Sequence, residues 1–179
     1  MGKTLAVLIL LLMICHENAN AEHGNHDNLK QVVTQLQFYM HDVVLGKNAT
    51  AVQVAPQNPV NSSAGVPSFG PVYVIDDPLT ETPHPKSKLV GRAQGLYAMS
   101  SKGELGLLMA LTYSWERGKY KDSSISVVGK NMVLRKQREL PIVGGTGVFR
   151  MARGYAFAHT FSSNGPDAII GYNVTIFHY

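Results

Sequence analysis

One carboxyl group has unusual surroundings, because Asp42 lies on a strand-like segment whose same side is apolar. Side chains alternate along an extended chain, which puts Phe38, Met40 and Val44 on the side of Asp42. A carboxylate that leaves water for apolar surroundings has a raised pKa unless a partner compensates. Asp42 is therefore a candidate to hold and transfer a proton.

Arg153 is the corresponding candidate cation. Its side of the expected strand carries Met151 and the aromatic residues Phe149, Tyr155, Phe157 and Phe161. A guanidinium in such surroundings can hold the negative charge that develops on a phenolic oxygen. The same spacing equally fits a buried ion pair between Asp42 and Arg153 with a structural role alone.

Tyr97 supplies a third polar group. It shares one side of its segment with Gly91, Ala93 and Gly95, so its ring has room and its hydroxyl can form a hydrogen bond. Packing in a core or an interface is the simpler interpretation of a single strand tyrosine. If Asp42, Arg153 and Tyr97 converge, they line an apolar, aromatic cavity suited to flat phenolic ligands.

The elements that must position these residues are strands. Apolar residues recur with a period of two from residue 36 onward, and Gly, Ser, Asn or Lys separates the segments. Proline-rich loops are expected at 55–71 and 78–88, and a hairpin turn at 100–103. The expected strands are 36–44, 72–77, 89–99, 105–115, 124–128, 148–161 and 169–179.

This pattern predicts an all-β fold. Roughly seven or eight short strands without helical crossovers indicate an antiparallel sandwich or a closed barrel. The segment 105–115 carries apolar residues on both sides, which favours the barrel. One side would fill a lumen, and the other would pack against a neighbouring subunit.

Composition narrows the function classes. The chain has 179 residues, of which 45% are hydrophobic and 16% charged, as in one globular domain. Its net charge is +4, but Lys and Arg are scattered, so no nucleic-acid partner is expected. The histidines lack metal-ligand spacing, and 144–147 lacks the lysine and helix of a phosphate loop. We expect no metal and no cofactor, and a tight strand connection at 144–147.

Residues 1–21 are predicted to be a signal peptide. Lys3 precedes an apolar stretch ending at Cys15, and 19–21 has the small-x-small pattern of a cleavage site. This stretch is too short to span a bilayer, and no later segment is long enough. We therefore expect a secreted protein without cysteine, membrane contact or disulfide bonds.

After cleavage, the organisation is simple. Residues 22–35 are expected to form a flexible N-terminus, and 36–179 the barrel domain. Secretion also makes the N-x-S/T motifs at Asn48, Asn61 and Asn173 expected glycosylation sites. Asn173 lies in a strand-like run, whereas the other two lie in turn-like sequence.

Several segments resemble those of the plant dirigent proteins. They are 38–42 (FYMHD), 69–72 (FGPV), 91–97 (GRAQGLY) and 143–154 (VGGTGVFRMARG), and 172–179 resembles the family's last strand. The resemblance spans 36–179 in order. It implies an eight-stranded antiparallel β-barrel, secreted to the apoplast, that forms a homo-oligomer, a dimer or a trimer, through its barrel faces.

The resemblance also implies alternative functions. Dirigent proteins lack an oxidative centre: they bind phenoxy radicals that a separate laccase or peroxidase generates, and they direct regio- and stereoselective coupling in phenylpropanoid and lignan formation. Related members resemble pterocarpan synthases, hydro-lyases that dehydrate an isoflavanol through a quinone methide. A third alternative is a non-catalytic cell-wall or defence protein that binds phenolics.

Site residues follow from the matching motifs. Asp42 corresponds to the family's cavity aspartate, Arg153 to the arginine of M-A-R-G, and Tyr97 to the tyrosine after R-A-Q-G. Val148 departs from the pattern, because lignan-forming members typically carry an aspartate after G-G-T-G. The resemblance therefore favours the branch that includes pterocarpan synthases and other non-lignan members, and leaves open whether the protein is a non-oxidative auxiliary or a hydro-lyase.

Overall fold

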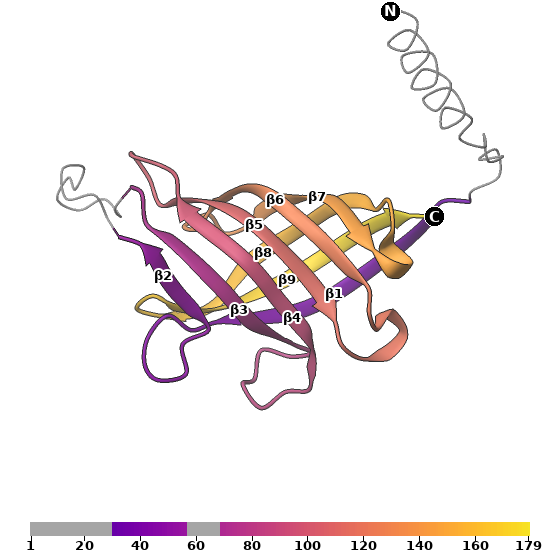
Figure 1. The fold of residues 1–179 in the computed structure, drawn as a ribbon, viewed down its shortest axis with the longest axis horizontal. Coiled ribbons are helices and arrows are strands. Elements are labelled where there is room, and N and C mark those ends of the chain that lie inside the picture. Colours follow the sequence, from indigo (N-terminus) through magenta and orange to yellow (C-terminus); the bar gives the residue numbers. More distant parts are fainter. Residues whose placement is uncertain (1–29, 57–68) are drawn as a thin grey trace, which may run out of the picture. The chain divides into compact units, whose positions relative to one another are not determined.

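A computed structural model describes residues 30–56 and 69–179. The expected signal peptide, residues 22–29 and Asn61 lie outside these ranges. The compact unit 31–179 is built from one antiparallel sheet (Figure 1). Its strands are β1 (Val32–Asp42), β2 (Ala51–Ala55), β3 (Val72–Thr80), β4 (Leu89–Met99), β5 (Gly106–Trp115), β6 (Ser124–Met132), β7 (Arg138–Thr146), β8 (Arg153–Asn164) and β9 (Asp167–His178).

The sheet closes on itself. Its order is β1-β9-β8-β7-β6-β5-β4-β3-β2, and β1 also pairs with β3 through Tyr39↔Thr80 and Met40↔Leu79. This short ladder closes the sheet into a barrel, while β2 pairs with another part of β3. The predicted closed, eight-stranded antiparallel barrel is confirmed, with β2 as an added strand.

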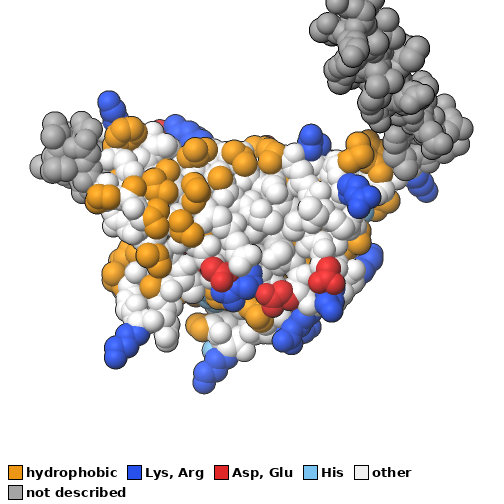
Figure 2. Space-filling model, in the orientation of Figure 1, with side chains coloured by type: hydrophobic (Ala, Val, Ile, Leu, Met, Phe, Trp, Pro, Cys, Tyr) orange, Lys and Arg blue, Asp and Glu red, His pale blue; other side chains and the backbone are white. Residues whose placement is uncertain are grey.

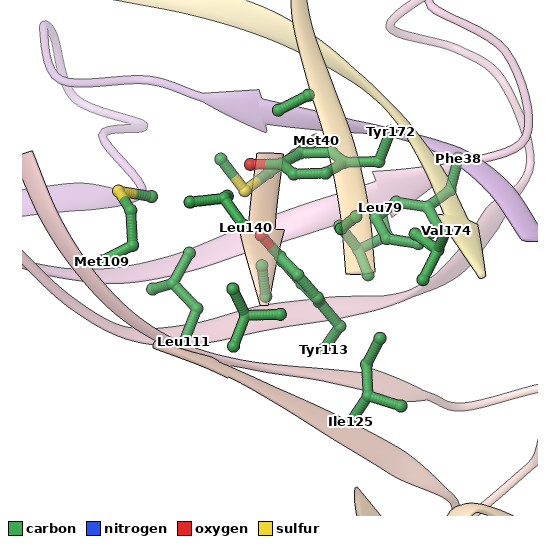
Figure 3. Packing of buried hydrophobic residues seen from close by; sticks show 14 of the residues in the cluster. Phe38, Met40, Leu79, Met109, Leu111, Tyr113, Ile125, Leu140, Tyr172 and Val174 are labelled. Carbon is green, nitrogen blue, oxygen red and sulfur yellow. The ribbon is translucent and has the colours of Figure 1, made fainter. Parts of the chain in front are cut away.

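Inward-pointing aromatic side chains fill part of the lumen. The ring centroids of Phe38 and Tyr172 lie 5.4 Å apart in a stacked arrangement, and Tyr113 lies 5.4 Å from Phe38 and 5.3 Å from Tyr172. Figure 3 shows these rings close together with Leu79 and Val174. Phe38 and Tyr172 are paired on the neighbouring strands β1 and β9, and Tyr113 projects from β5. Such packing, worth roughly 0.5–1.5 kcal/mol per aromatic pair beyond area burial, gives the barrel a solid core beside its cavity.

Two strands were absent from the sequence prediction. β2 is short, and β7 contains Pro141 and two glycines, so neither shows a clear alternation of apolar residues. β1 also begins at Val32 rather than at residue 36, because residues 32–35 continue the ladder with β9. Residues 32–35 therefore belong to the barrel and not to the expected N-terminal segment.

The start of β8 also differs from the prediction. The strand begins at Arg153 and not at residue 148, because Gly147–Phe149 forms a 3-10 turn. Gly147 and Met151 both have φ of 61°, in the left-handed region that L-residues rarely adopt. The glycines at 144–147 therefore lead into a tight connection, as predicted.

We expect Gly95→Ala to destabilise the barrel. A Cβ at Gly95 would lie 2.2 Å from the carbonyl oxygen of Ala110, and Gly95 has a φ of +141°. Overpacking and backbone strain together are expected to lower the free energy of unfolding by about 2 kcal/mol or more. Chemical denaturation measures the change. Gly103→Ala is the control, because no atom lies within 4 Å of its Cβ position, and an equal loss in both variants would contradict the prediction.

No helix among the described residues combines the length and the apolar character needed to cross a membrane. The helical elements found there are the 3-10 turns Gly118–Tyr120 and Gly147–Phe149.

Candidate functional site

A cavity of about 540 Å³ occupies the lumen beyond the aromatic core. This volume falls within the roughly 300–1,000 Å³ typical of small-molecule sites. Apolar side chains such as Met40, Met109 and Ile170 make much of its wall. The polar and charged side chains that join them are Asp42, Tyr73, Tyr97, Asn131, Arg135, Lys136, Arg138, Thr160, Ser163 and Tyr172.

Asp42 lies at the end of β1 and lines this cavity. The pKa of Asp42 is raised to about 6: burial is the main cause, a hydrogen bond with Tyr97 opposes the shift, and the charge of Asp167 adds to it. One carboxyl oxygen, Oδ1, is buried and has no hydrogen-bond partner among the described residues. Asp42 can therefore hold a proton up to about pH 6 and transfer it to a ligand in the cavity.

Tyr97 lies beside Asp42, with which its side chain forms a hydrogen bond. It projects from β4 into the cavity, and its ring stacks on Tyr73 with centroids 5.0 Å apart. Burial and the neighbouring carboxyl groups raise the pKa of Tyr97, so its hydroxyl keeps its proton. The group can orient Asp42 or donate a hydrogen bond to a ligand oxygen.

Of the cations that line the cavity, Arg135 and Lys136 are exposed and Arg138 is buried. The sequence analysis did not single out Arg138. It is 4% exposed at the start of β7, and its Nε donates to Asn131 Oδ1 at 3.1 Å. Its Nη1 donates to Thr160 Oγ1 at 3.0 Å and to the Arg135 carbonyl at 3.3 Å. Among the described residues, no carboxylate forms a salt bridge with Arg138. A negatively charged oxygen of a ligand would provide the counter-ion that Arg138 lacks.

Asp77 is a second carboxyl group behind the cavity wall. The side chain is 0% exposed on β3, and its Oδ1 accepts a hydrogen bond from the Thr50 hydroxyl at 2.5 Å. Burial, followed by the charge of Asp42, raises the pKa of Asp77 to about 8. Tyr73, Ile75 and Asp77 occupy alternate positions of the expected strand 72–77 and so lie on the same side of it. The burial of Asp77 was therefore predictable from the sequence.

Because of the raised pKa of Asp77, we expect the protein to become less stable as the pH rises from about 6.5 to 8. In that range folded Asp77 binds a proton that the unfolded chain has released, so the free energy of unfolding falls with rising pH. The lowered pKa of His41 acts in the opposite direction, but only at more acidic pH. Denaturation across this range should show the decline in the natural sequence and a flatter profile in Asp77→Asn; equal slopes would contradict the assignment.

The structure does not place Arg153 in the cavity. Its side chain is exposed, and its Nη1 donates to the carbonyl oxygens of Val143 at 2.6 Å and Ala152 at 2.9 Å. Because β8 begins only at Arg153, the inward side is set by Ala156 and Ala158, and the residues that alternate with Arg153 face outward. The expected convergence of Arg153 with Asp42 is therefore wrong.

Val148 also lies away from the cavity lining. It is 44% exposed in the turn before β8, and its N–H donates to Ser123 Oγ at 3.0 Å. Its identity therefore says little about the charge of the lumen in this chain.

Two of the expected glycosylation positions are accessible. Asn48 is exposed in the connection between β1 and β2, and Asn173 is exposed on β9. Their modification stays a prediction, and Asn61 lies outside the described residues.

Together, the fold and the cavity define a class of protein: a closed β-barrel with a partly apolar lumen that a carboxyl group, a tyrosine hydroxyl and a buried guanidinium line. The sequence places the chain within a family. A sequence profile described as "Dirigent-like protein" matches residues 33–177, and the chain belongs to the dirigent family.

Individual relatives cover most of the chain. Dirigent protein 23 of Arabidopsis thaliana is 51% identical over 99% of this chain and 96% of its own length. Pterocarpan synthase 1 of Glycyrrhiza echinata is 45% identical over 82% of this chain and 78% of its own. The solved structure of the pterocarpan synthase dirigent protein GePTS1 superposes with a TM-score of 0.78 at 42% identity, covering 85% of this chain and 88% of that one.

Proposed function

We propose that the protein binds a phenolic substrate in the lumen, promotes its dehydration to a quinone methide, and fixes the face on which the next bond forms. The observation that carries this proposal is the carboxyl group of Asp42, which lines an apolar cavity and holds its proton to about pH 6. The similarity to pterocarpan synthases supports the same chemistry.

The proposed reaction balances without an oxidant. Asp42 gives a proton to the leaving hydroxyl, the C–O bond breaks, and water departs. A phenolic O–H of the substrate loses its proton as its oxygen becomes the carbonyl of the quinone methide, and Arg138 stabilises the negative charge on that oxygen. The proton of the first phenol returns to the carboxylate of Asp42. A second phenolic oxygen then adds to the electrophilic carbon, and its proton goes to the quinone-methide oxygen, which becomes a phenol again.

Stereoselectivity requires only a modest preference. Holding one approach geometry about 1.4 kcal/mol better than its mirror image gives tenfold selectivity. A rigid barrel with inward aromatic side chains is suited to this task, because the substrate ring is confined between fixed walls. Tyr97 and Arg138 project into the cavity from different strands and would hold different oxygens of the substrate.

Two parallel incubations of the purified protein test the proposal. One contains a racemic isoflavanol and no oxidant, and the other contains coniferyl alcohol and a laccase. Products are separated by chiral chromatography against controls without the protein. We expect a pterocarpan in the first incubation, with enantiomeric enrichment of the product or the remaining substrate.

Other outcomes would replace the proposal. Enantiomeric excess in the laccase incubation alone would make the protein a director of phenoxy-radical coupling. Binding of both phenolics with no change in products would indicate a non-catalytic phenolic-binding protein.

Secretion to the apoplast and homo-oligomer formation belong to the same proposal. A second copy of the chain fits the outer face of β2–β6, where a row of apolar residues crosses the strands. Val52 pairs with Val74, Val74 with Leu96, Leu96 with Ala110, and Ala110 with Val128. Figure 2 shows hydrophobic side chains gathered over this part of the barrel. A contiguous exposed apolar surface of this kind is typical of a protein interface.

We expect Leu96→Glu to convert the oligomer to a monomer. The substitution puts a charge in the middle of the apolar row, and burying that charge between two copies is unfavourable. Light scattering after size exclusion measures the mass. Val148→Glu is the control, since Val148 is similarly exposed but lies outside the row. A monomeric natural protein, or an oligomer that survives Leu96→Glu, would contradict the use of this face.

A further inference from the structure

Two carboxyl groups lie just beyond the short seam between β1 and β3. The paired residues are Tyr39↔Thr80 and Met40↔Leu79, and Asp42 and Asp77 follow this ladder on the two strands. The two groups are close enough for the charge of Asp42 to raise the pKa of Asp77. Charged groups of like sign repel each other, and the repulsion is strong where water is excluded.

Thr50 occupies the place where this ladder stops. Its N–H donates to the Val43 carbonyl at 2.7 Å, and its own carbonyl accepts from the N–H of Asp76 at 2.8 Å, so it connects β1 with β3. Its hydroxyl accepts from the N–H of Val43 at 3.1 Å and donates to Asp77 Oδ1. The hydroxyl therefore holds Asp77 in one orientation at the seam.

Each of the two carboxyl groups keeps one buried oxygen without a partner. Within 30–56 and 69–179, Asp42 Oδ1 and Asp77 Oδ2 have no hydrogen-bond partner. Among the residues that the structure describes, no cation forms a salt bridge with Asp77: Arg92 pairs with the neighbouring Asp76 and only partly offsets the raised pKa of Asp77. Two unpaired carboxylates at such a seam would be very unfavourable, whereas one added proton removes the repulsion.

From this arrangement we infer that Asp42 and Asp77 form a proton-sharing pair, in which the buried Asp77 is a positioning residue that controls how Asp42 gains and loses its proton. Asp77 does not line the cavity, so it acts on the substrate only through Asp42. The inference deepens the proposed function, because it concerns the same acid. Other titratable groups also face the pair: Tyr97, Asp76, Arg92, Asp167, Tyr113 and Tyr172.

Titration of the carboxyl carbons by NMR tests the pair without any substrate. The intact protein is labelled with 13C at aspartate, and the signals are followed between about pH 3 and 9. We expect Asp42→Asn to lower the midpoint of Asp77 by at least one pH unit, a tenfold loss of proton affinity, because the charge of its partner is gone. Asp122→Asn, at an exposed position in the turn before β6, should leave that midpoint in place.

The opposite result overturns the inference. If the midpoint of Asp77 is unchanged by Asp42→Asn, or is already that of an ordinary aspartate, the two groups do not share a proton. Since this measurement needs no turnover, its failure is distinct from a failure of the proposed reaction. Where turnover is measurable, Asp77→Asn should remove one inflection from the pH–rate profile, a change that loss of packing alone would not cause.

Thr50 provides a second test should Asp42→Asn fold poorly. Thr50→Val removes the hydroxyl that stabilises ionised Asp77 and should raise the Asp77 midpoint, whereas Thr50→Ser retains the donor and should not. An unchanged midpoint in Thr50→Val would overturn the role of the seam. Thr50 is also the third residue of the sequon at Asn48, so Asn48→Gln separates any effect of a glycan from that of the hydroxyl.

Discussion

Asp42→Asn is expected to reduce dehydration of the phenolic substrate by roughly 10²- to 10⁴-fold, the usual contribution of a positioned general acid. The amide has the shape of the carboxyl group but cannot give a proton to the leaving hydroxyl. Folding should be preserved, because the substitution removes a half-buried group whose ionised form is unfavourable in the lumen. Turnover of the racemic isoflavanol, followed by chromatography, gives the rate.

The matched control for this variant is Asp122→Asn. Asp122 is exposed in the turn before β6, and its φ of 62° is one that asparagine also tolerates. Turnover in the control should match that of the natural sequence. If Asp42→Asn retains full turnover and the same product enantiomer while its fold is intact by circular dichroism, the acid role assigned to Asp42 is wrong.

The second large effect is expected at Arg138. Arg138→Met keeps a long side chain against the cavity but removes the cation, and we expect a loss of roughly 10²- to 10³-fold in kcat, the range for a lost donor to a developing oxyanion. Ground-state binding should change less, because the substrate phenol is neutral before it reacts. The split between kcat and KM therefore distinguishes transition-state stabilisation from simple loss of fit.

Arg153→Met, compared with Arg138→Met, tests which of the two arginines acts in the cavity. The motif assigns Arg153 to the site, whereas the geometry binds it to backbone carbonyls on the outside of the barrel. We expect kcat within about twofold of the natural sequence, since surface substitutions usually have small effects. A greater loss in Arg153→Met than in Arg138→Met would show that the motif and not the geometry identifies the cation.

The fold was predictable because its determining signal is local. Alternation with a period of two is present in nearly every strand, and glycines and prolines mark the breaks between them. β7 escaped prediction because Pro141 and its glycines interrupt that alternation, and its neighbours in the sheet hold it in place. With β7 missing, Arg138 had no strand to place it in the lumen.

The residues of the candidate site could be predicted only on strands whose inward and outward sides could also be predicted. Asp42 and Tyr97 lie on well-formed strands, and their meeting follows from alternation together with closure of the barrel. Arg153 follows a 3-10 turn that begins at Gly147, and both Gly147 and Met151 have a positive φ, which shifts the side to which later residues point. No pattern of apolar residues reveals such a shift, and a one-residue change of register exchanges inside and outside.

The ladder between β1 and β9 ties the beginning of the domain to its end, from Val32↔His178 to Asp42↔Ala168. During synthesis β1 leaves the ribosome first and β9 last. The main partner of β1 is therefore available only after nearly the whole chain has been made. Until then β1 and β8 are open sheet edges that can pair with other chains. A premature stop in the last 12-residue strand is therefore expected to yield aggregated or degraded protein and no partly active barrel.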